Sequence, residues 1–79
     1  MSTFEKVREL VLEAKMNEVE PEAITESSHL LDDLKLDSMD VMALVMEIER
    51  VFDVEIPDEM LASVKTVGDI VEHLDKQGK

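Results

Sequence analysis

Ser38 is the residue of this sequence whose setting most suggests chemistry. It lies in the segment Asp37-Ser38-Met39-Asp40, directly before an apolar run with helical spacing. A helix N-terminus presents free backbone N–H groups and a positive dipole end, so a phosphate ester on Ser38 would be favoured there. The simpler interpretation is that Asp37 or Ser38 only caps the helix. This pattern alone leaves both interpretations open.

Three methionines follow the serine. Met39, Met42 and Met46 recur at helical spacing, on a side of the predicted helix away from its main apolar face. Neighbouring helices could bury them, or they could form a flexible apolar surface that contacts several partners. Acidic residues would surround such a surface, namely Asp40, Glu47, Glu49, Asp53, Glu55 and Glu59.

Metal and catalytic sites have little support in the sequence. The aspartate-rich stretch from Asp32 fails the EF-hand pattern, which needs glycine where Asp37 lies and glutamate where Ala43 lies. A Ser38-His29-aspartate arrangement lacks a nucleophile elbow, and a chain this small leaves little room for a substrate pocket. We therefore expect no metal site, no catalytic residue and no enzymatic activity.

The composition narrows the class of protein further. A chain of 79 residues that is 44% hydrophobic predicts one folded domain, residues 1–79, with a modest core. The net charge of -12 disfavours nucleic acid as a partner and favours basic protein surfaces. Residues 37–60 hold 8 acids and 1 base, a net charge of -7. The sequence has no cysteine, no apolar run long enough to span a membrane and no signal-peptide pattern, so we expect a soluble, monomeric, cytoplasmic protein.

The elements that must position Ser38 are predicted to be helices. Apolar periodicity predicts helices over 3–16, 38–52 and 66–76, and Pro57 predicts the start of a short helix over 58–63. A long loop is expected over 17–37. Ser2 with Glu5, and Thr66 with Asp69, have the spacing of helix-capping pairs. The predicted fold class is all-α, a small four-helix bundle of three main helices and one short helix.

The core is predicted from the apolar faces of these helices. The faces comprise Phe4, Val7, Leu10, Val11 and Ala14; then Val41, Leu44, Val45, Ile48, Val51 and Phe52; and finally Val67, Ile70, Val71 and Leu74. A loop as long as 17–37 is uncommon in a small domain unless it is functional or pinned to the core. Five apolar residues can pin it, namely Ile24, Leu30, Leu31, Leu34 and Leu36.

Taken together, these segments resemble the acyl carrier proteins. The resemblance is carried by "DSMD" at 37–40, "LVMEIE" at 44–49, "FDVEIPDE" at 52–59 and "TVGDIVEHL" at 66–74, and it covers nearly the whole chain. It implies that Ser38 receives 4′-phosphopantetheine from coenzyme A through a magnesium-dependent phosphopantetheinyl transferase. The thiol of this arm would hold acyl groups as thioesters and present them to fatty-acid or polyketide-type enzymes.

The resemblance also implies where partners bind. Basic patches on the transferase and on the acyl-processing enzymes would meet six acids, namely Asp37, Asp40, Glu47, Glu49, Glu55 and Asp58. Met39 and Met46 would supply apolar contacts to the same enzymes. The core face of the second helix could part to hold an acyl chain, because aliphatic and methionine packing with few aromatic residues is deformable. Other residues would help to line that space, namely Leu30, Leu31 and Leu34 from the loop and Val67 and Ile70 from the last helix.

Several positions depart from the family's usual pattern. Lys35 replaces a glycine before the Asp-Ser pair, and lysine adopts a positive φ less readily if one is needed there. Fatty-acid carriers have more polar residues at the positions of Val41, Met42 and Ala43, including an acid at that of Ala43. Arg50 adds positive charge to the acidic face. These departures favour a specialised carrier. The alternatives are a peptidyl or aminoacyl carrier, and a small acidic interaction module in which Ser38 is only a cap.

Overall fold

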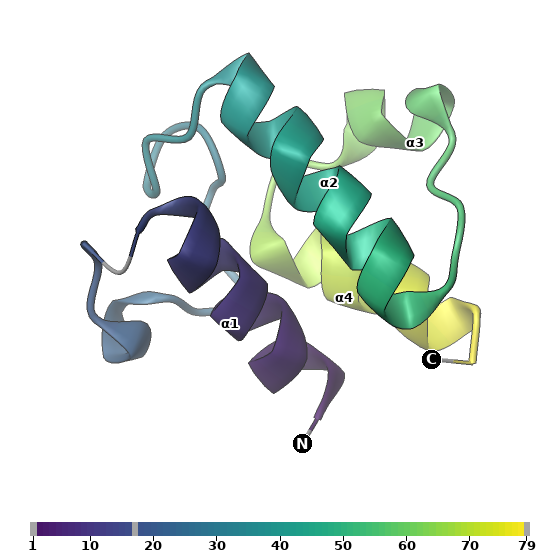
Figure 1. Ribbon diagram of the computed structural model, residues 1–79, viewed down its shortest axis with the longest axis horizontal. Coiled ribbons are helices and arrows are strands. Elements are labelled where there is room, and N and C mark those ends of the chain that lie inside the picture. The colour runs from purple at the N-terminus through teal and green to yellow at the C-terminus, as the bar shows by residue number, and fades with distance from the viewer. Residues whose placement is uncertain (1, 17, 79) are drawn as a thin grey trace.

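The fold is a bundle of helices, as the sequence predicts. The computed structural model describes residues 2–16 and 18–78, so Met1, Asn17 and Lys79 lie outside the described residues. The helices are α1 (Thr3–Ala14), α2 (Ser38–Phe52), α3 (Asp58–Ser63) and α4 (Val67–Lys76), with a short 3-10 helix η1 (Pro21–Ala23) in the long loop. Figure 1 shows α1 and α2 side by side and running in opposite directions, and α1 also packs against α4. The described residues form no strand, only an isolated bridge between His29 and Thr66.

Capping boxes fix where the three longer helices begin. In each box the side chain of the N-cap residue accepts the N–H of the third helical residue, whose own side chain accepts the N-cap N–H. The pairs are Ser2 with Glu5, Asp37 with Asp40, and Thr66 with Asp69. The first and third pairs confirm the predicted caps.

The predicted length of the first helix was wrong by two residues. This helix ends at Ala14 rather than at 16, and Met16 has a φ of 54°. The Met16 N–H bonds to the Glu13 carbonyl at 3.0 Å, which is the i to i+3 bond of a tightened last turn. The chain therefore leaves the helical path just after its C-cap, Lys15.

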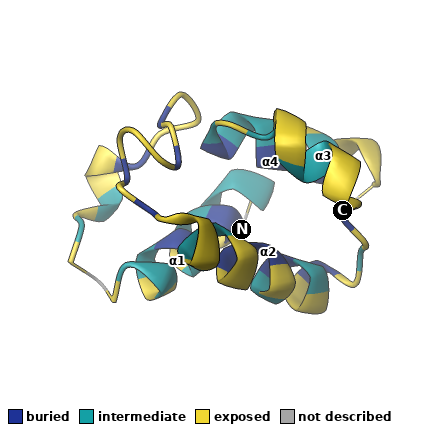
Figure 2. Cartoon of the chain, turned by 90° about the horizontal axis from the view of Figure 1, so that it is seen from above, coloured by how far each residue is buried: buried dark blue, intermediate teal, exposed yellow. Residues whose placement is uncertain are grey.

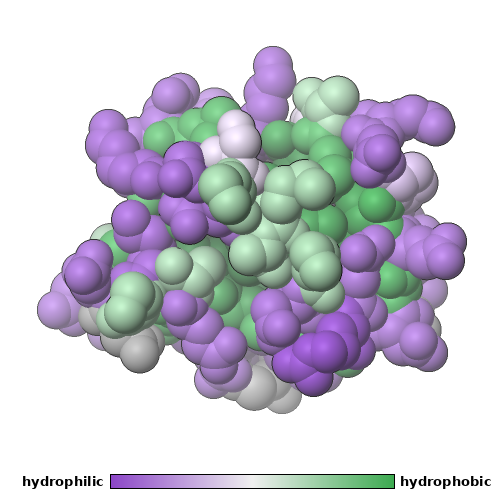
Figure 3. Space-filling model, turned by 45° about the horizontal axis from the view of Figure 1, so that its top comes forward, coloured by the Kyte–Doolittle hydropathy of each residue, from purple (hydrophilic) through white to green (hydrophobic). Residues whose placement is uncertain are grey.

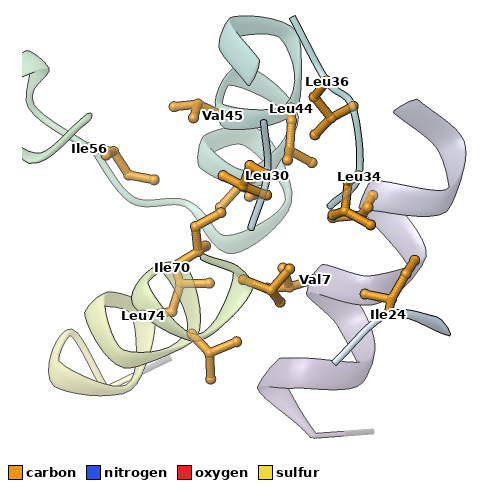
Figure 4. Packing of buried hydrophobic residues seen from close by; sticks show 14 of the residues in the cluster. Val7, Ile24, Leu30, Leu34, Leu36, Leu44, Val45, Ile56, Ile70 and Leu74 are labelled. Atoms are coloured by element: carbon orange, nitrogen blue, oxygen red, sulfur yellow. The ribbon is translucent and has the colours of Figure 1, made fainter. Parts of the chain in front are cut away.

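The core lies between the helices and the long loop. Figure 2 shows the buried residues on the inner faces of the helices, with α1 and α2 on one side and α3 and α4 on the other. Loop residues Ile24, Leu30, Leu34 and Leu36 are buried, and Figure 4 shows them converging with residues of α1, α2 and α4. The expectation that these four residues pin the loop is therefore confirmed.

Two residues predicted to be in the core are exposed. Val51 is 47% exposed because it lies at the edge of the buried face, about 60° around the helix from Ile48, and close to the end of α2. Leu31 is 57% exposed and lines a groove beside Ser38, so it does not pin the loop. The immediate neighbour of Leu31, Leu30, takes the core position.

Backbone hydrogen bonds fasten the second half of the loop to the segment that leads into α4. The Leu30 N–H donates to the Lys65 carbonyl at 2.9 Å, and the Val67 N–H donates to the Ser28 carbonyl at 3.0 Å. The Leu36 N–H then donates to the Leu30 carbonyl at 3.0 Å, which ties the approach to α2 to the same segment. The start of α2, and with it Ser38, is therefore held in a fixed place relative to α3 and α4.

Candidate functional site

Ser38 is the first residue of α2 and is exposed. The cap of this helix is Asp37, whose Oδ1 accepts the Asp40 N–H at 2.8 Å, while Asp40 Oδ2 accepts the Asp37 N–H at 3.2 Å. Because Asp37 holds the cap, the interpretation of Ser38 as the cap is wrong. Within residues 2–16 and 18–78 the Ser38 hydroxyl has no hydrogen-bond partner, so it is available for other chemistry.

The approach to Ser38 contains an uncommon backbone conformation. Lys35 has a φ of 59°, in the left-handed region that glycine adopts most easily. This position therefore does need a positive φ, which the sequence had left open. The flanking residues Leu34 and Leu36 are both buried, while Lys35 is exposed, so the kink lets two nearby leucines enter the core.

An apolar groove of about 580 Å³ lies beside Ser38. Its walls come from the loop, α2, α3 and the connection between α3 and α4. The apolar lining comprises Leu30, Leu31, Val41, Met42, Leu61 and Val64, and the polar lining comprises His29, Asp32, Ser38 and Lys65. Sequence reasoning named Leu30 and Leu31 for an acyl chain but missed Leu61 and Val64, because no periodic signal links residues from separate segments.

The three methionines of α2 form an exposed surface, which we call the methionine surface (Met39, Met42 and Met46). Their exposed fractions are 81%, 53% and 65% respectively. Figure 3 shows weakly hydrophobic residues gathered in the middle of one face of the molecule, bordered by hydrophilic residues. Of the two interpretations of this stripe, burial by neighbouring helices is therefore wrong, and the apolar surface is confirmed.

The six acids expected to meet partners have different local contacts. Asp37 and Asp40 are engaged in the capping box. Glu47 accepts a hydrogen bond from Arg50 at 2.7 Å, and this bond with the guanidinium charge lowers the pKa of Glu47. Glu49 is half-buried and accepts the Ile56 N–H at 2.7 Å, so its carboxylate fastens the chain that follows α2. The remaining two acids, Glu55 and Asp58, are exposed.

The structure brings His29 and Ser38 to the same groove without linking them. Among the described residues, no hydrogen bond joins the Ser38 hydroxyl to His29. In that part of the chain, no three His, Asp or Glu side chains are grouped so that they could hold a metal ion. None of the described helices has both the length and the apolar content that a bilayer crossing requires.

Known proteins share both this sequence pattern and this fold. Residues 5–74 match the family described as the phosphopantetheine attachment site. The chain is 43% identical over 75 residues to the acyl carrier protein of Wolinella succinogenes, covering 95% of this chain and 96% of the relative. It is 40% identical over 79 residues to that of Campylobacter curvus, covering 100% of both. A solved acyl carrier protein from Enterococcus faecalis is 31% identical with a TM-score of 0.73, covering 94% of this chain and 95% of that one.

Site and fold together define a carrier domain that bears a phosphopantetheine group. The chain belongs to the acyl carrier proteins. Its cofactor is 4′-phosphopantetheine, and its role is to carry acyl groups in biosynthesis, with acyl chains and acyl-processing enzymes as partners. Members of this family are carriers rather than catalysts. An exposed hydroxyl without an internal partner, beside an apolar groove, fits a group of this kind.

Proposed function

We propose that Ser38 is the residue that bears the 4′-phosphopantetheine of this carrier. The observation that carries the proposal is the position of Ser38 as the exposed first residue of α2, next to an N-cap already supplied by Asp37. In addition, the backbone N–H groups of Ser38 and Met39 have no acceptor among the described residues, so they remain free for a phosphate. The neighbouring carboxylates Asp37 and Asp40 oppose that phosphate electrostatically, and we assign them to partner recognition instead.

The groove beside Ser38 is proposed to receive the apolar part of the cargo. When attached, the cofactor supplies a terminal thiol that holds acyl groups as thioesters. The chain's own contribution is a wall of aliphatic side chains and Met42, which can shift to admit an acyl chain. Fatty-acid or polyketide-type enzymes would then receive the cargo from this end of the molecule.

The acids of α2 and of the chain that follows it are proposed to attract basic patches on the transferase and the acyl-processing enzymes. Charge complementarity of this kind raises association rates and weakens with salt. Glu55 and Asp58 are exposed, so they are free to meet a partner. We expect Glu49 to contribute less, because its carboxylate is bound to the Ile56 N–H.

A charge reversal separates this recognition from a general effect of net charge. We expect Asp58→Lys to slow modification by the transferase, with the largest difference from the parent at low ionic strength. Asp75→Lys is the matched control, since it makes the same change at an exposed acid in the last turn of α4. Equal rates for the two variants at low and high salt would show that recognition does not depend on where the charge lies.

The attachment itself is tested by intact mass. The protein is incubated with coenzyme A, magnesium and a broad-specificity phosphopantetheinyl transferase, beside Ser38→Ala and a control variant, Ser27→Ala, at another exposed serine. We expect the parent and Ser27→Ala each to gain one phosphopantetheinyl group, and Ser38→Ala to gain none. A gain in Ser38→Ala would place the attachment elsewhere and overturn the proposal.

We further propose that residues 1–79 work as a single domain that catalyses no reaction itself, as a monomer in the cytoplasm. The family match over 5–74 supports one domain, and the net charge of -12 supports a monomer because like-charged copies repel each other. Size-exclusion chromatography with light scattering tests the monomer, for which we expect one species whose mass does not change with concentration.

A further inference from the structure

The methionines that the structure describes, Met16 to Met60, occupy three different environments. Those of the methionine surface are exposed and lie on the same helix as Ser38. Met16 is 79% exposed and lies beyond the end of α1, so it is not part of the helix that carries Ser38. Met60 in α3 is half-buried and packs against the core. Exposure decides how readily an oxidant reaches a thioether sulfur, so these environments predict different reactivities.

We propose that the methionine surface is a peroxide-sensitive modification site that controls docking of partner enzymes. Each thioether sulfur would accept one oxygen atom from a peroxide, whose O–O bond breaks, so that one methionine sulfoxide and one water are formed from hydrogen peroxide. The sulfur is oxidised by two electrons and the peroxide is reduced by two. A methionine sulfoxide reductase can reverse the change, which makes it suitable for regulation.

Oxidation should change the surface without unfolding the domain. The opposite face of α2 carries the core residues Leu44, Val45 and Ile48, none of which contains sulfur. A sulfoxide turns a flexible apolar side chain into a polar one, which disrupts methionine-rich interfaces. Three such changes would make this apolar surface polar, while the hydrophilic residues that border the apolar area in Figure 3 stay unchanged.

The effect on docking rests on the proposed function, because it concerns the surface next to Ser38. Met39 immediately follows the proposed attachment residue, and Met42 lines the groove beside it. The transferase must approach this end of α2 to reach the hydroxyl. The rate of phosphopantetheine transfer is therefore a direct measure of docking at the methionine surface.

The first measurement maps the sites of oxidation and does not depend on the attachment proposal. Folded protein is treated with hydrogen peroxide at increasing times, digested and analysed by mass spectrometry. We expect sulfoxide to appear on Met16, Met39, Met42 and Met46 before it appears on Met60. Oxidation of Met60 at the same rate as the exposed methionines would overturn the proposed selectivity.

The second measurement compares transfer rates before and after peroxide, each variant against its own untreated sample. We expect transfer to the parent to fall on the order of tenfold, as when a central apolar contact of an interface is lost, and to recover after treatment with methionine sulfoxide reductases. After peroxide, the transfer rate of Met16→Leu should fall as much as that of the parent, since this variant keeps the three methionines of the methionine surface. The triple variant Met39→Leu, Met42→Leu, Met46→Leu should keep its own untreated rate.

The outcomes separate the two proposals. Equal rates for the parent before and after peroxide, or an equal loss in the triple leucine variant, would overturn the switch and leave Ser38 as the attachment residue. If the untreated, folded parent gains no phosphopantetheine, the attachment proposal fails and the switch fails with it. Far-UV circular dichroism of the oxidised parent completes the test, because loss of helix would attribute the slower transfer to unfolding and overturn the proposal.

Discussion

The N-termini of α2 and α4 share one capping arrangement but have opposite surroundings. Each has a capping box with aspartate as the third helical residue, namely Asp40 in α2 and Asp69 in α4. The first helical residue is exposed Ser38 in one helix and fully buried Val67 in the other. Local capping therefore determines where both helices start, but it does not determine what each helix start is used for.

The long loop accounts for the difference. It covers the start of α4, where the Gly68 N–H donates to the Glu26 carbonyl at 2.8 Å and the Val67 N–H donates to the Ser28 carbonyl. At the start of α2, the corresponding N–H groups of Ser38 and Met39 have no acceptor among the described residues. The domain thus uses the start of α4 to anchor its loop and leaves the start of α2 open, where we propose that phosphopantetheine is attached.

Substitutions at the first residue of each helix, Val67 in α4 and Ser38 in α2, should show the largest difference in stability. We expect Val67→Ser to lower the free energy of unfolding by about 2–4 kcal/mol, because it removes buried apolar groups and buries a hydroxyl. Ser38→Val should change that free energy by no more than about 0.5 kcal/mol, because the side chain is exposed, while it abolishes phosphopantetheine transfer. Urea unfolding followed by far-UV circular dichroism measures both values, and equal losses would show that the two helix starts are not different in packing.

Substitutions at the second residue of each helix, Gly68 in α4 and Met39 in α2, should show a smaller difference in the free energy of unfolding. A Cβ on Gly68 would lie 2.8 Å from the Glu26 carbonyl oxygen, a backbone atom that cannot easily move. We expect Gly68→Ala to lower the free energy of unfolding by about 1–3 kcal/mol, despite the better helix propensity of alanine. Met39→Ala occupies the equivalent position in α2 and should cost less than about 0.5 kcal/mol, since Met39 is exposed. An unchanged stability of Gly68→Ala in the same urea titration would mean that the loop can move away from α4.

Asp69, the capping-box partner of Thr66 in α4, should make the stability of the domain depend on pH. Asp69 Oδ2 accepts the N–H of Lys65 at 2.9 Å and the N–H of Thr66 at 3.0 Å, and these bonds lower the pKa of Asp69. A carboxyl whose pKa is lower in the folded state than in the unfolded state adds stability above its unfolded pKa. This contribution is lost as the pH falls from about 4 through the folded pKa.

Asp69→Asn provides the measurement. We expect this variant to be less stable than the parent at neutral pH and to lose less stability than the parent as the pH falls below about 4. Asp75→Asn, at an exposed acid in the last turn of the same helix, should keep the pH dependence of the parent. If the free energy of unfolding fell equally with pH in Asp69→Asn and in the parent, this carboxylate would have no role in acid sensitivity.

Much of this arrangement is predictable from the sequence because it depends on local patterns. Apolar spacing predicted the three longer helices and Pro57 predicted the start of the short one, and the bounds of α2 and α3 agree with the structure. The capping pairs Ser2 with Glu5 and Thr66 with Asp69 were visible because the two members lie three residues apart. The serine at the start of α2 was likewise recognisable from its immediate neighbours.

The features that the sequence did not predict depend on contacts between distant residues. Gly68 carries no local sign that its backbone meets Glu26, and Glu49 carries none that its carboxylate binds the Ile56 N–H. Leu30 and Leu31 look alike in the sequence, yet only the fold decides which of them enters the core. The groove was missed for the same reason, because its walls come from four separate segments.

The backbone segments that lead into α2 and α4 differ as well. Substitutions there should give the smallest predicted change in the free energy of unfolding. Two residues before each N-cap, Lys35 has a φ of 59° while Val64 has a φ of -80°. A side chain in the left-handed region costs free energy that glycine does not incur, although glycine also loses more backbone entropy on folding. We therefore expect Lys35→Gly to raise the free energy of unfolding by about 0.5–1 kcal/mol.

Val64→Gly is the matched change before α4. It should lower the free energy of unfolding by about 1 kcal/mol or more, because Val64 packs against the core and already has an ordinary φ. If urea titrations show that Lys35→Gly raises the free energy of unfolding and Val64→Gly lowers it, the backbone strain lies next to Ser38 and not at the start of α4. A loss of stability in Lys35→Gly would instead mean that the lysine side chain contributes more to the folded state than its backbone costs.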